Sequence, residues 1–253
     1  MDIGVFSKYI LGFLFILLRA SVFIGMLPFF GSKNLPFQFK VGFIIAMAMV
    51  LTPVIEVKVS RGDIPVLLIR EVVVGMALGF IARFVFFAVE IAAQLISAAM
   101  GLSVAGLFNP EFGQSTDIGM LYGTIAMLVF LSMDAHHDLI YVFVRSYGWL
   151  PEGGRVDVMG IMEEVLSVLE RMFVIAIKLS APVLTIMVIT NLLLGFIYRA
   201  TPQMNVFFIS SPIYVFIGFL VMLLGVSVFI YLSGAYFNTV RDEMSRVLIP
   251  KRG

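Results

Sequence analysis

The sequence contains no cysteine, only two histidines and few charged residues. Without cysteine the chain can form no disulfide framework, haem attachment or thiolate metal site. Charged residues make up 13% of the 253 residues and apolar residues make up 61%, whereas soluble domains are about 25% charged and about 45–50% apolar. A soluble enzyme would lack the polar residues it needs to cover its surface, so we expect a membrane protein.

The charges are nearly balanced, because 17 lysines and arginines face 16 acidic residues. A nucleic-acid partner would require clustered basic side chains, so none is expected. The apolar run of residues 9–30 is longer than the core of a signal peptide and has the length of a membrane-spanning helix. We therefore expect insertion into the inner membrane with nothing removed.

The two histidines, His136 and His137, lie next to Asp138 between two apolar runs. Neighbouring residues on a helix diverge by about 100°, so the two imidazoles are not expected to bind one metal ion. Ser103 would need a histidine base in a membrane-depth helix to act as a protease nucleophile, and neither histidine lies clearly in such a helix. We expect no enzyme activity, no metal and no cofactor.

Apolar runs predict six helical regions within one domain that covers residues 1–253. The regions are 9–30, 38–55, 64–108, 118–147, 165–198 and 212–237. As single helices, 64–108 would be about 65 Å long and 165–198 about 50 Å, against a hydrocarbon core of about 30 Å. Region 64–108 is expected either to turn back on itself or to leave the hydrocarbon and pack against protein. Pro182 predicts a kink or break in 165–198.

Several polar side chains fall inside these apolar regions. They are Arg19, Glu71, Arg83, Glu90, Gln94, Lys178, Asn191 and Arg199. Ionisable groups that face lipid cost several kcal/mol, so they normally face a bundle interior or water. They could line a pore or relay protons, or they could form structural ion pairs between subunits. The rule that buried charges pair favours the second interpretation.

Glu71, Gly75, Gly79 and Arg83 recur at every fourth position and therefore share one sector of a helix. Gly75 and Gly79 form a G-x-x-x-G pattern, which lets a neighbouring backbone approach closely. The combination predicts a helix face that packs against protein and not against lipid.

The segment 106–114 is predicted to be a loop, because Pro110 forbids helix continuation and Gly113 permits a tight turn. It nevertheless carries Phe108 and Phe112, which need a place to be buried. An anchor at the membrane surface and a plug that projects into a channel remain equally open from the chemistry.

The stretch Gly195-Phe-Ile-Tyr-Arg-Ala-Thr-Pro-Gln-Met-Asn-Val-Phe207 is the most specific feature of the sequence. It predicts a helix end with Arg199 near its C-terminus, stopped by Pro202. Gln203 and Asn205 then supply side-chain amides. A polar stretch of this kind at a membrane edge is typical of contact with another protein.

This stretch closely resembles the G-x-x-x-R-x-x-P-Q-x-N-V-F sequence of the FliR family, the flagellar type III export-gate subunit. Other family patterns are similar in the same order: Arg19 with Pro28, Pro36 with Lys40, and Glu71-x-x-x-Gly75-x-x-x-Gly79. Asn109 departs from the family, which usually carries Asp before Pro110. The departure keeps the turn and removes a possible acidic contact.

The resemblance implies an all-α fold of membrane-associated helical hairpins, packed in a pseudo-helical, cone-like export gate with FliP and FliQ-type subunits. It implies a place in the bacterial inner membrane and flagellar basal body, with membrane lipid, an FlhB-type switch protein and unfolded flagellar export substrates as further partners. Members of the family are not enzymes. The resemblance also assigns roles to residues: a pore plug at Phe108, Asn109, Pro110 and Phe112, and a subunit interface at Arg19, Glu71, Gly75, Gly79, Arg83, Arg199, Pro202, Gln203, Asn205 and Phe207.

Two other functions remain open from the sequence. One is the corresponding gate subunit of a virulence injectisome. The other is a proton-coupled secondary transporter in which Glu71, Glu90 and Lys178 relay protons, although no internal inverted repeat is present.

Overall fold

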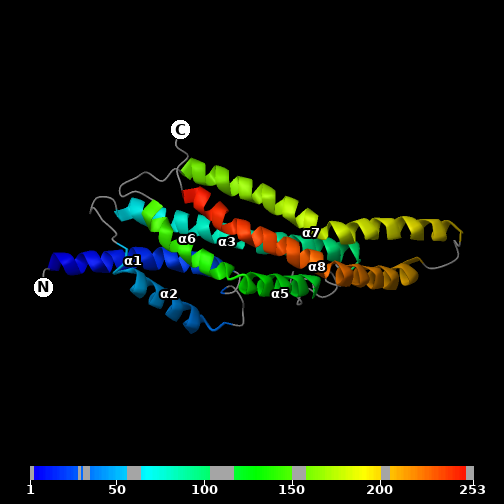
Figure 1. Ribbon diagram of the computed structural model, residues 1–253, viewed down its shortest axis with the longest axis horizontal. Helices are drawn as coiled ribbons and strands as arrows, with labels where there is room; N and C mark the ends of the chain where they lie inside the picture. Colours follow the sequence, from blue (N-terminus) through cyan, green and yellow to red (C-terminus); the bar gives the residue numbers. More distant parts are fainter. Residues whose placement is uncertain are drawn as a thin grey trace. The chain divides into compact units, whose positions relative to one another are not determined.

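The computed structural model describes residues 3–27, 30, 35–55, 64–102, 117–149, 158–200 and 206–248. Every regular element in these ranges is an α-helix, which confirms the all-α expectation (Figure 1). The helices are α1 (Ile3–Met26), α2 (Phe37–Leu51), α3 (Ile64–Ala99), α5 (Asp117–Ser132), α6 (Ala135–Trp149), α7 (Val158–Ala200) and α8 (Val206–Leu248).

Four of the described helices are long and apolar enough to cross a membrane, and α5 with α6 counts as a fifth if the pair forms one broken span. The four spans are Tyr9–Met26, Ile64–Ala99, Met159–Ala200 and Ser210–Arg246. α2 is apolar but has only 15 residues, which gives it a length of about 22 Å and makes it too short to cross.

α3 ends earlier than the predicted region 64–108, because Gly101 closes it. Gly101 has a φ of 75°, which glycine adopts without a steric cost. Its N–H donates to the carbonyl of Ala98, and the N–H of Leu102 donates to the carbonyl of Ser97. This pair of hydrogen bonds is the Schellman arrangement that ends many helices. α3 therefore ends at Ala99, before the end of the predicted region, and does not turn back on itself before that residue. The rest of the predicted region, residues 103–108, lies outside the described residues.

The predicted region 118–147 is divided into two helices at Met133 and Asp134. Asp134 has a φ of 54°, a left-handed conformation that aspartate tolerates better than most residues and that ends α5. By contrast, α7 continues without a break through Pro182, so the alternative of a broken helix there is wrong. A proline removes one backbone hydrogen bond, and the remaining bonds of a 43-residue helix hold it together in apolar surroundings.

The contacts divide the chain into two compact units. Unit 1 contains residues 1–84, 136–168 and 239–253, and unit 2 contains residues 85–135 and 169–238. α3, α7 and α8 contribute residues to both units. The expectation of a single domain stays a prediction.

Unit 1 is built on the contact of α1 with the first half of α3. A Cβ atom on Gly75 would lie 3.1 Å from the backbone oxygen of Arg19, and one on Gly79 would lie 2.8 Å from the Cβ of Met26. The two helices approach this closely because neither glycine has a side chain. α2 packs beside α1 in the same unit (Figure 1).

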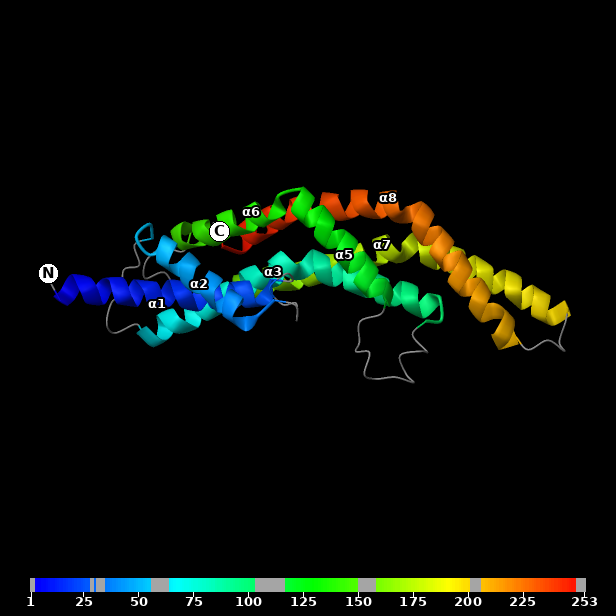
Figure 2. The same cartoon turned by 90° about the horizontal axis from the view of Figure 1, so that it is seen from below.

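Unit 2 is held together by aromatic side chains from three helices. The rings of Phe86 on α3, Phe130 on α5 and Phe237 on α8 lie 5.0–5.4 Å apart, centroid to centroid. Tyr122 of α5 and Phe229 of α8 add a second contact at 4.3 Å. Figure 2 shows α5 and α8 of this unit in the view turned by 90°. These contacts fall within the range at which aromatic pairs attract beyond their buried area.

Candidate functional site

A buried ion pair between Arg19 of α1 and Glu71 of α3 forms the polar centre of unit 1. The Arg19 Nε donates to one Glu71 carboxylate oxygen at 2.5 Å, and its Nη2 donates to the other at 2.8 Å. The two side chains are 0% and 4% exposed. The two hydrogen bonds of a bidentate pair offset part of the free-energy cost of removing both charges from water.

α6 completes the coordination of Arg19. The Nη1 of Arg19 donates to the Ser146 hydroxyl oxygen at 2.7 Å, and that hydroxyl in turn donates to the Phe143 carbonyl at 2.5 Å. The guanidinium carbon lies 3.8 Å from the centroid of the Tyr147 ring. A cation over an aromatic face gains further electrostatic attraction when both are shielded from water. Arg19 therefore joins three helices, and the stacked rings of Phe23 and Phe143, 4.9 Å apart, extend the contact of α1 with α6.

A second arginine gives this cluster an excess of positive charge. The Arg70 Nε lies 3.8 Å from the Glu71 Oε1, and the Arg70 side chain is 14% exposed. Two guanidinium groups thus share one carboxylate. Because Arg19 holds the bidentate position, Arg70 contributes mainly a long-range attraction, and its stem lies close to the surface of the unit.

Other polar residues that the sequence places at membrane depth lie on exposed positions of the chain. Glu90, Gln94, Lys178 and Asn191 are exposed. The Tyr214 hydroxyl of α8 donates to the side-chain oxygen of Asn191 on α7, so this amide has a partner within unit 2.

The surface of α7 and α8 is apolar over most of its length. We compare the apolar 18-residue stretch that makes each helix a candidate span. Within that stretch, 17% of the residues are buried in α8 and 39% in α7, against 61% in α3. Phe196 is 70% exposed, Leu223 is 71% exposed and Leu224 is 74% exposed. Large exposed apolar side chains along a helix require lipid or another protein to cover them.

An apolar hollow of about 310 Å³ opens between α2 and α6 in unit 1. Phe43, Met47 and Val50 line it from α2, and Ile140 and Val144 line it from α6. It contains no polar lining atoms, so it offers no chemistry for a reaction and fits only an apolar group.

The predicted site residues are distributed over these features and over undescribed positions. The proposed plug residues, Phe108, Asn109, Pro110 and Phe112, lie outside the described residues, as do Pro202, Gln203 and Asn205. Phe207 lies in the first turn of α8, and Arg199 is exposed in the last turn of α7. Arg83 is partly buried on α3.

The structure brings Arg19, Glu71, Gly75 and Gly79 together on the contact between α1 and α3 of one chain. The assignment of the predicted set to a subunit interface stays a prediction. Sequence reasoning missed Ser146 and Tyr147, which complete the coordination of Arg19. A fully buried guanidinium has five donors and requires more acceptors than one carboxylate provides, and this requirement is the signal that could have directed attention to α6.

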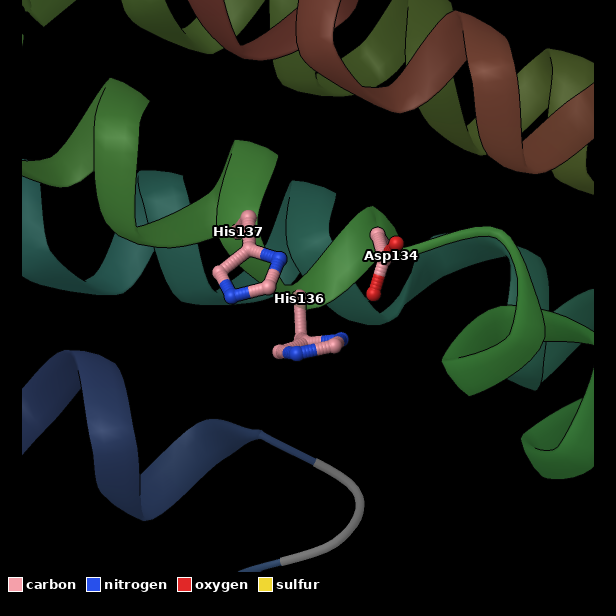
Figure 3. A group of neighbouring side chains, drawn as sticks. All are labelled: Asp134, His136 and His137. Atoms are coloured by element: carbon pink, nitrogen blue, oxygen red, sulfur yellow. The ribbon is translucent and has the colours of Figure 1, made fainter.

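The two histidines lie closer together than the sequence argument expects. In the first turn of α6 the rings of His136 and His137 are 4.1 Å apart, centroid to centroid, and tilted by 36°. Figure 3 shows them beside Asp134, which precedes the helix. The expectation that neighbouring rings diverge is wrong here, because rotation about the side-chain bonds offsets the 100° step between the two Cα positions.

Helix lengths, composition and buried polar contacts define the class: the chain is an all-α, multi-pass membrane protein. Comparison with known proteins then identifies the family. The model of the family described as "Bacterial export proteins, family 1" matches residues 10–240, and the chain belongs to this family.

Several similar proteins carry the name flagellar biosynthetic protein FliR. The flagellar biosynthetic protein FliR of Bacillus subtilis (strain 168) is 30% identical over 243 residues, covering 93% of this chain and 94% of the relative. The protein of the same name from Escherichia coli (strain K12) is 28% identical over 214 residues, with 81% and 80% covered. The secretion system apparatus protein SsaT of Salmonella typhimurium is 27% identical over 145 residues, with 56% of each chain covered.

Replacing Glu71 by Gln should destabilise the full chain strongly, because the buried guanidinium of Arg19 would lose its counter-charge. Breaking one side of a buried pair costs about 3–5 kcal/mol. The exposed pair of Arg241 and Asp138, 3.2 Å apart, provides the matched control, since Asp138→Asn removes a carboxylate whose pair is worth below about 1 kcal/mol. Thermal midpoints in detergent micelles measure both changes.

The companion variant replaces both partners, as Arg19→Met with Glu71→Leu. This double variant should regain much of the lost stability, because no unpaired charge then remains buried. Equal thermal midpoints for Glu71→Gln and the parent chain would contradict the assigned role of the pair.

Proposed function

We infer that this chain is the FliR-type subunit of the flagellar type III protein export apparatus in the bacterial inner membrane. The observation that carries the inference is the match of the export-protein family over residues 10–240, together with relatives named FliR that align along nearly the whole chain. The matched family and the relatives named FliR are components of protein export, so the proposed role is that of a transport component.

The lengths and surfaces of the helices support work within an assembly. α7 and α8 have 43 residues each, about 65 Å if straight, and a hydrocarbon core is about 30 Å thick. Large parts of these apolar helices would extend beyond the bilayer if the chain stood alone. Their exposed side chains need a cover of protein there, because contact with water would cost about 25 cal/mol per Å² of apolar surface.

We propose FliP and FliQ-type subunits as that cover, and the FlhB-type switch protein as a further neighbour at the gate. The exposed Phe196 and Arg199 at the end of α7 belong to the contact surface in this proposal. The contact of α1 with α3 would hold the chain in the shape that this surface needs. That contact is made by Arg19, Glu71, Gly75 and Gly79. Unfolded flagellar proteins would pass through the pore that the subunits enclose.

Two observations favour this function over its rivals. The alignment to SsaT covers 56% of the chain, whereas the alignment to the Bacillus FliR covers 93%, so the flagellar system is preferred to an injectisome. In a proton-coupled transporter the Glu71 carboxylate would have to accept and release a proton. Both of its oxygens, however, accept hydrogen bonds from Arg19. Both oxygens of this carboxylate are therefore engaged, which leaves Glu71 poorly placed to exchange a proton.

The proposed function is tested by export assays in a strain that lacks the gene for this chain. The parent chain should restore flagellin in the culture medium, and Phe196→Arg should not, because a charge on the α7 surface would prevent association with the gate subunits. Met159→Arg is the control, since Met159 is equally exposed, at 75%, and lies close to the charged residues Glu163 and Glu164. The restored flagellin is quantified by immunoblot.

Co-purification of the two variants with the FliP and FliQ-type subunits locates the defect. Phe196→Arg should lose these partners and Met159→Arg should retain them. Normal flagellin secretion without this chain would contradict the proposed function, and a Phe196→Arg chain that secretes normally would contradict the proposed surface.

The plug proposal concerns Phe108 and Phe112. Apolar side chains that close a narrow pore exclude water and therefore ions, so replacing both by Ala should make resting cells leak. Uptake of a small membrane-impermeant dye in cells that express the complete gate measures the leak. Replacement of Phe108 and Phe112 by Leu is the control, since it keeps apolar bulk. Equal dye uptake in the Ala variant and the parent would remove the plug role.

A further inference from the structure

We propose that Asp134, His136 and His137 form a binding site for a divalent transition-metal ion of the zinc class. One ligand atom from each of the three side chains lies within 4.8 Å of the other two (Figure 3). Asp134 and His137 are exposed and His136 is partly buried, with its Nδ1 atom enclosed, so an ion would approach from the side of Asp134 and His137. The site is independent of the export function.

The donor set suits such an ion. Two imidazoles and one carboxylate are ligands that zinc accepts, and a water molecule can occupy the fourth position. Copper and nickel also favour imidazole, whereas calcium and magnesium require oxygen donors. The chain has no cysteine and no other histidine, so this segment holds every imidazole that the protein can offer to a metal.

The distances require only a small adjustment. Three ligand atoms at about 2.1 Å from a tetrahedral zinc ion lie about 3.4 Å from one another. The present separations of up to 4.8 Å exceed this value by about 1.4 Å. Rotation about the side-chain bonds of largely exposed residues closes a difference of this size without moving the backbone.

The local backbone sets the approach of the three side chains. Asp134 has a φ of 54° in the turn immediately before α6, and His136 and His137 occupy the first turn of that helix. The geometry of four consecutive residues therefore holds the group together. The rings of His136 and His137 lie 4.1 Å apart, centroid to centroid, so the two imidazoles are neighbours before an ion binds.

One electrostatic factor opposes the ion and another supports it. The N-terminus of a helix carries a partial positive charge, which disfavours a cation. The Asp134 carboxylate supplies a negative charge at the site and offsets this effect, whereas the Asp138 carboxylate in the first helical turn is paired with Arg241 at 3.2 Å.

Zinc titration of the full chain tests the proposal. The chain is purified with a tag that contains no histidine, reconstituted in lipid nanodiscs, and titrated with Zn²⁺ against a chromophoric chelator. We expect one ion per chain with a dissociation constant in the micromolar range. Binding of Co²⁺ should add the visible absorption of a nitrogen- and oxygen-coordinated ion, which distinguishes a defined site from loosely held metal.

Variants separate the ligands from their surroundings. His136→Ala, His137→Ala and Asp134→Asn should each weaken Zn²⁺ binding at least about tenfold, because even outer partners of a metal site are worth 10- to 100-fold. Asp138→Asn is the matched control, and we expect a change below about threefold. Circular dichroism of each variant in the same nanodiscs establishes that the helices are retained.

Two results would overturn the proposal. One is the absence of stoichiometric Zn²⁺ binding by the parent chain. The other is equal affinity in the parent and in the double variant His136→Ala with His137→Ala, which would place the metal elsewhere on the protein or on the lipid.

Discussion

The charge of Arg19 is the constraint on which unit 1 depends. A guanidinium that is 0% exposed in an apolar helix is tolerated only where protein supplies a counter-charge and hydrogen-bond acceptors. Glu71, Ser146 and the Tyr147 ring supply them from two other helices. The positions of α1, α3 and α6 are therefore coupled, because a shift of any one of them would leave part of the guanidinium without a partner.

The glycines of α3 follow from the same requirement. Arg19 and Glu71 meet at 2.5 Å only if the backbones of α1 and α3 come close, and Gly75 and Gly79 allow this approach. Close packing and charge pairing thus reinforce each other within unit 1. Unit 2 has no comparable polar centre among its described residues. Aromatic contacts hold it together, and its long helices leave their apolar surface to be covered by lipid or by partner subunits.

Much of this could be predicted from the sequence, and the failures have physical causes. Composition predicts a membrane protein, the apolar runs predict its helical regions, and the four-residue spacing from Glu71 predicts a face packed against protein. Spacing along one helix does not identify the neighbouring helix, so Ser146 was missed. The end of α3 was placed too late because Gly101 resembles any membrane glycine until its hydrogen bonds are known. The proximity of His136 and His137 depends on side-chain rotation, which periodicity does not describe.

The central claim is that the Glu71–Gly75 face of α3 packs against α1 of the same chain. Because the chain has no cysteine, a pair introduced as Val22→Cys with Gly75→Cys tests it against a clean background. A Cβ on Gly75 would lie 3.2 Å from the Cβ of Val22, slightly less than the spacing of about 3.5–4.5 Å in disulfides, so α1 and α3 must separate slightly to accept the bond. Mild oxidation in native membranes should give a bond within one chain, seen as a faster-migrating monomer in a non-reducing gel. A crosslinked dimer would contradict the account.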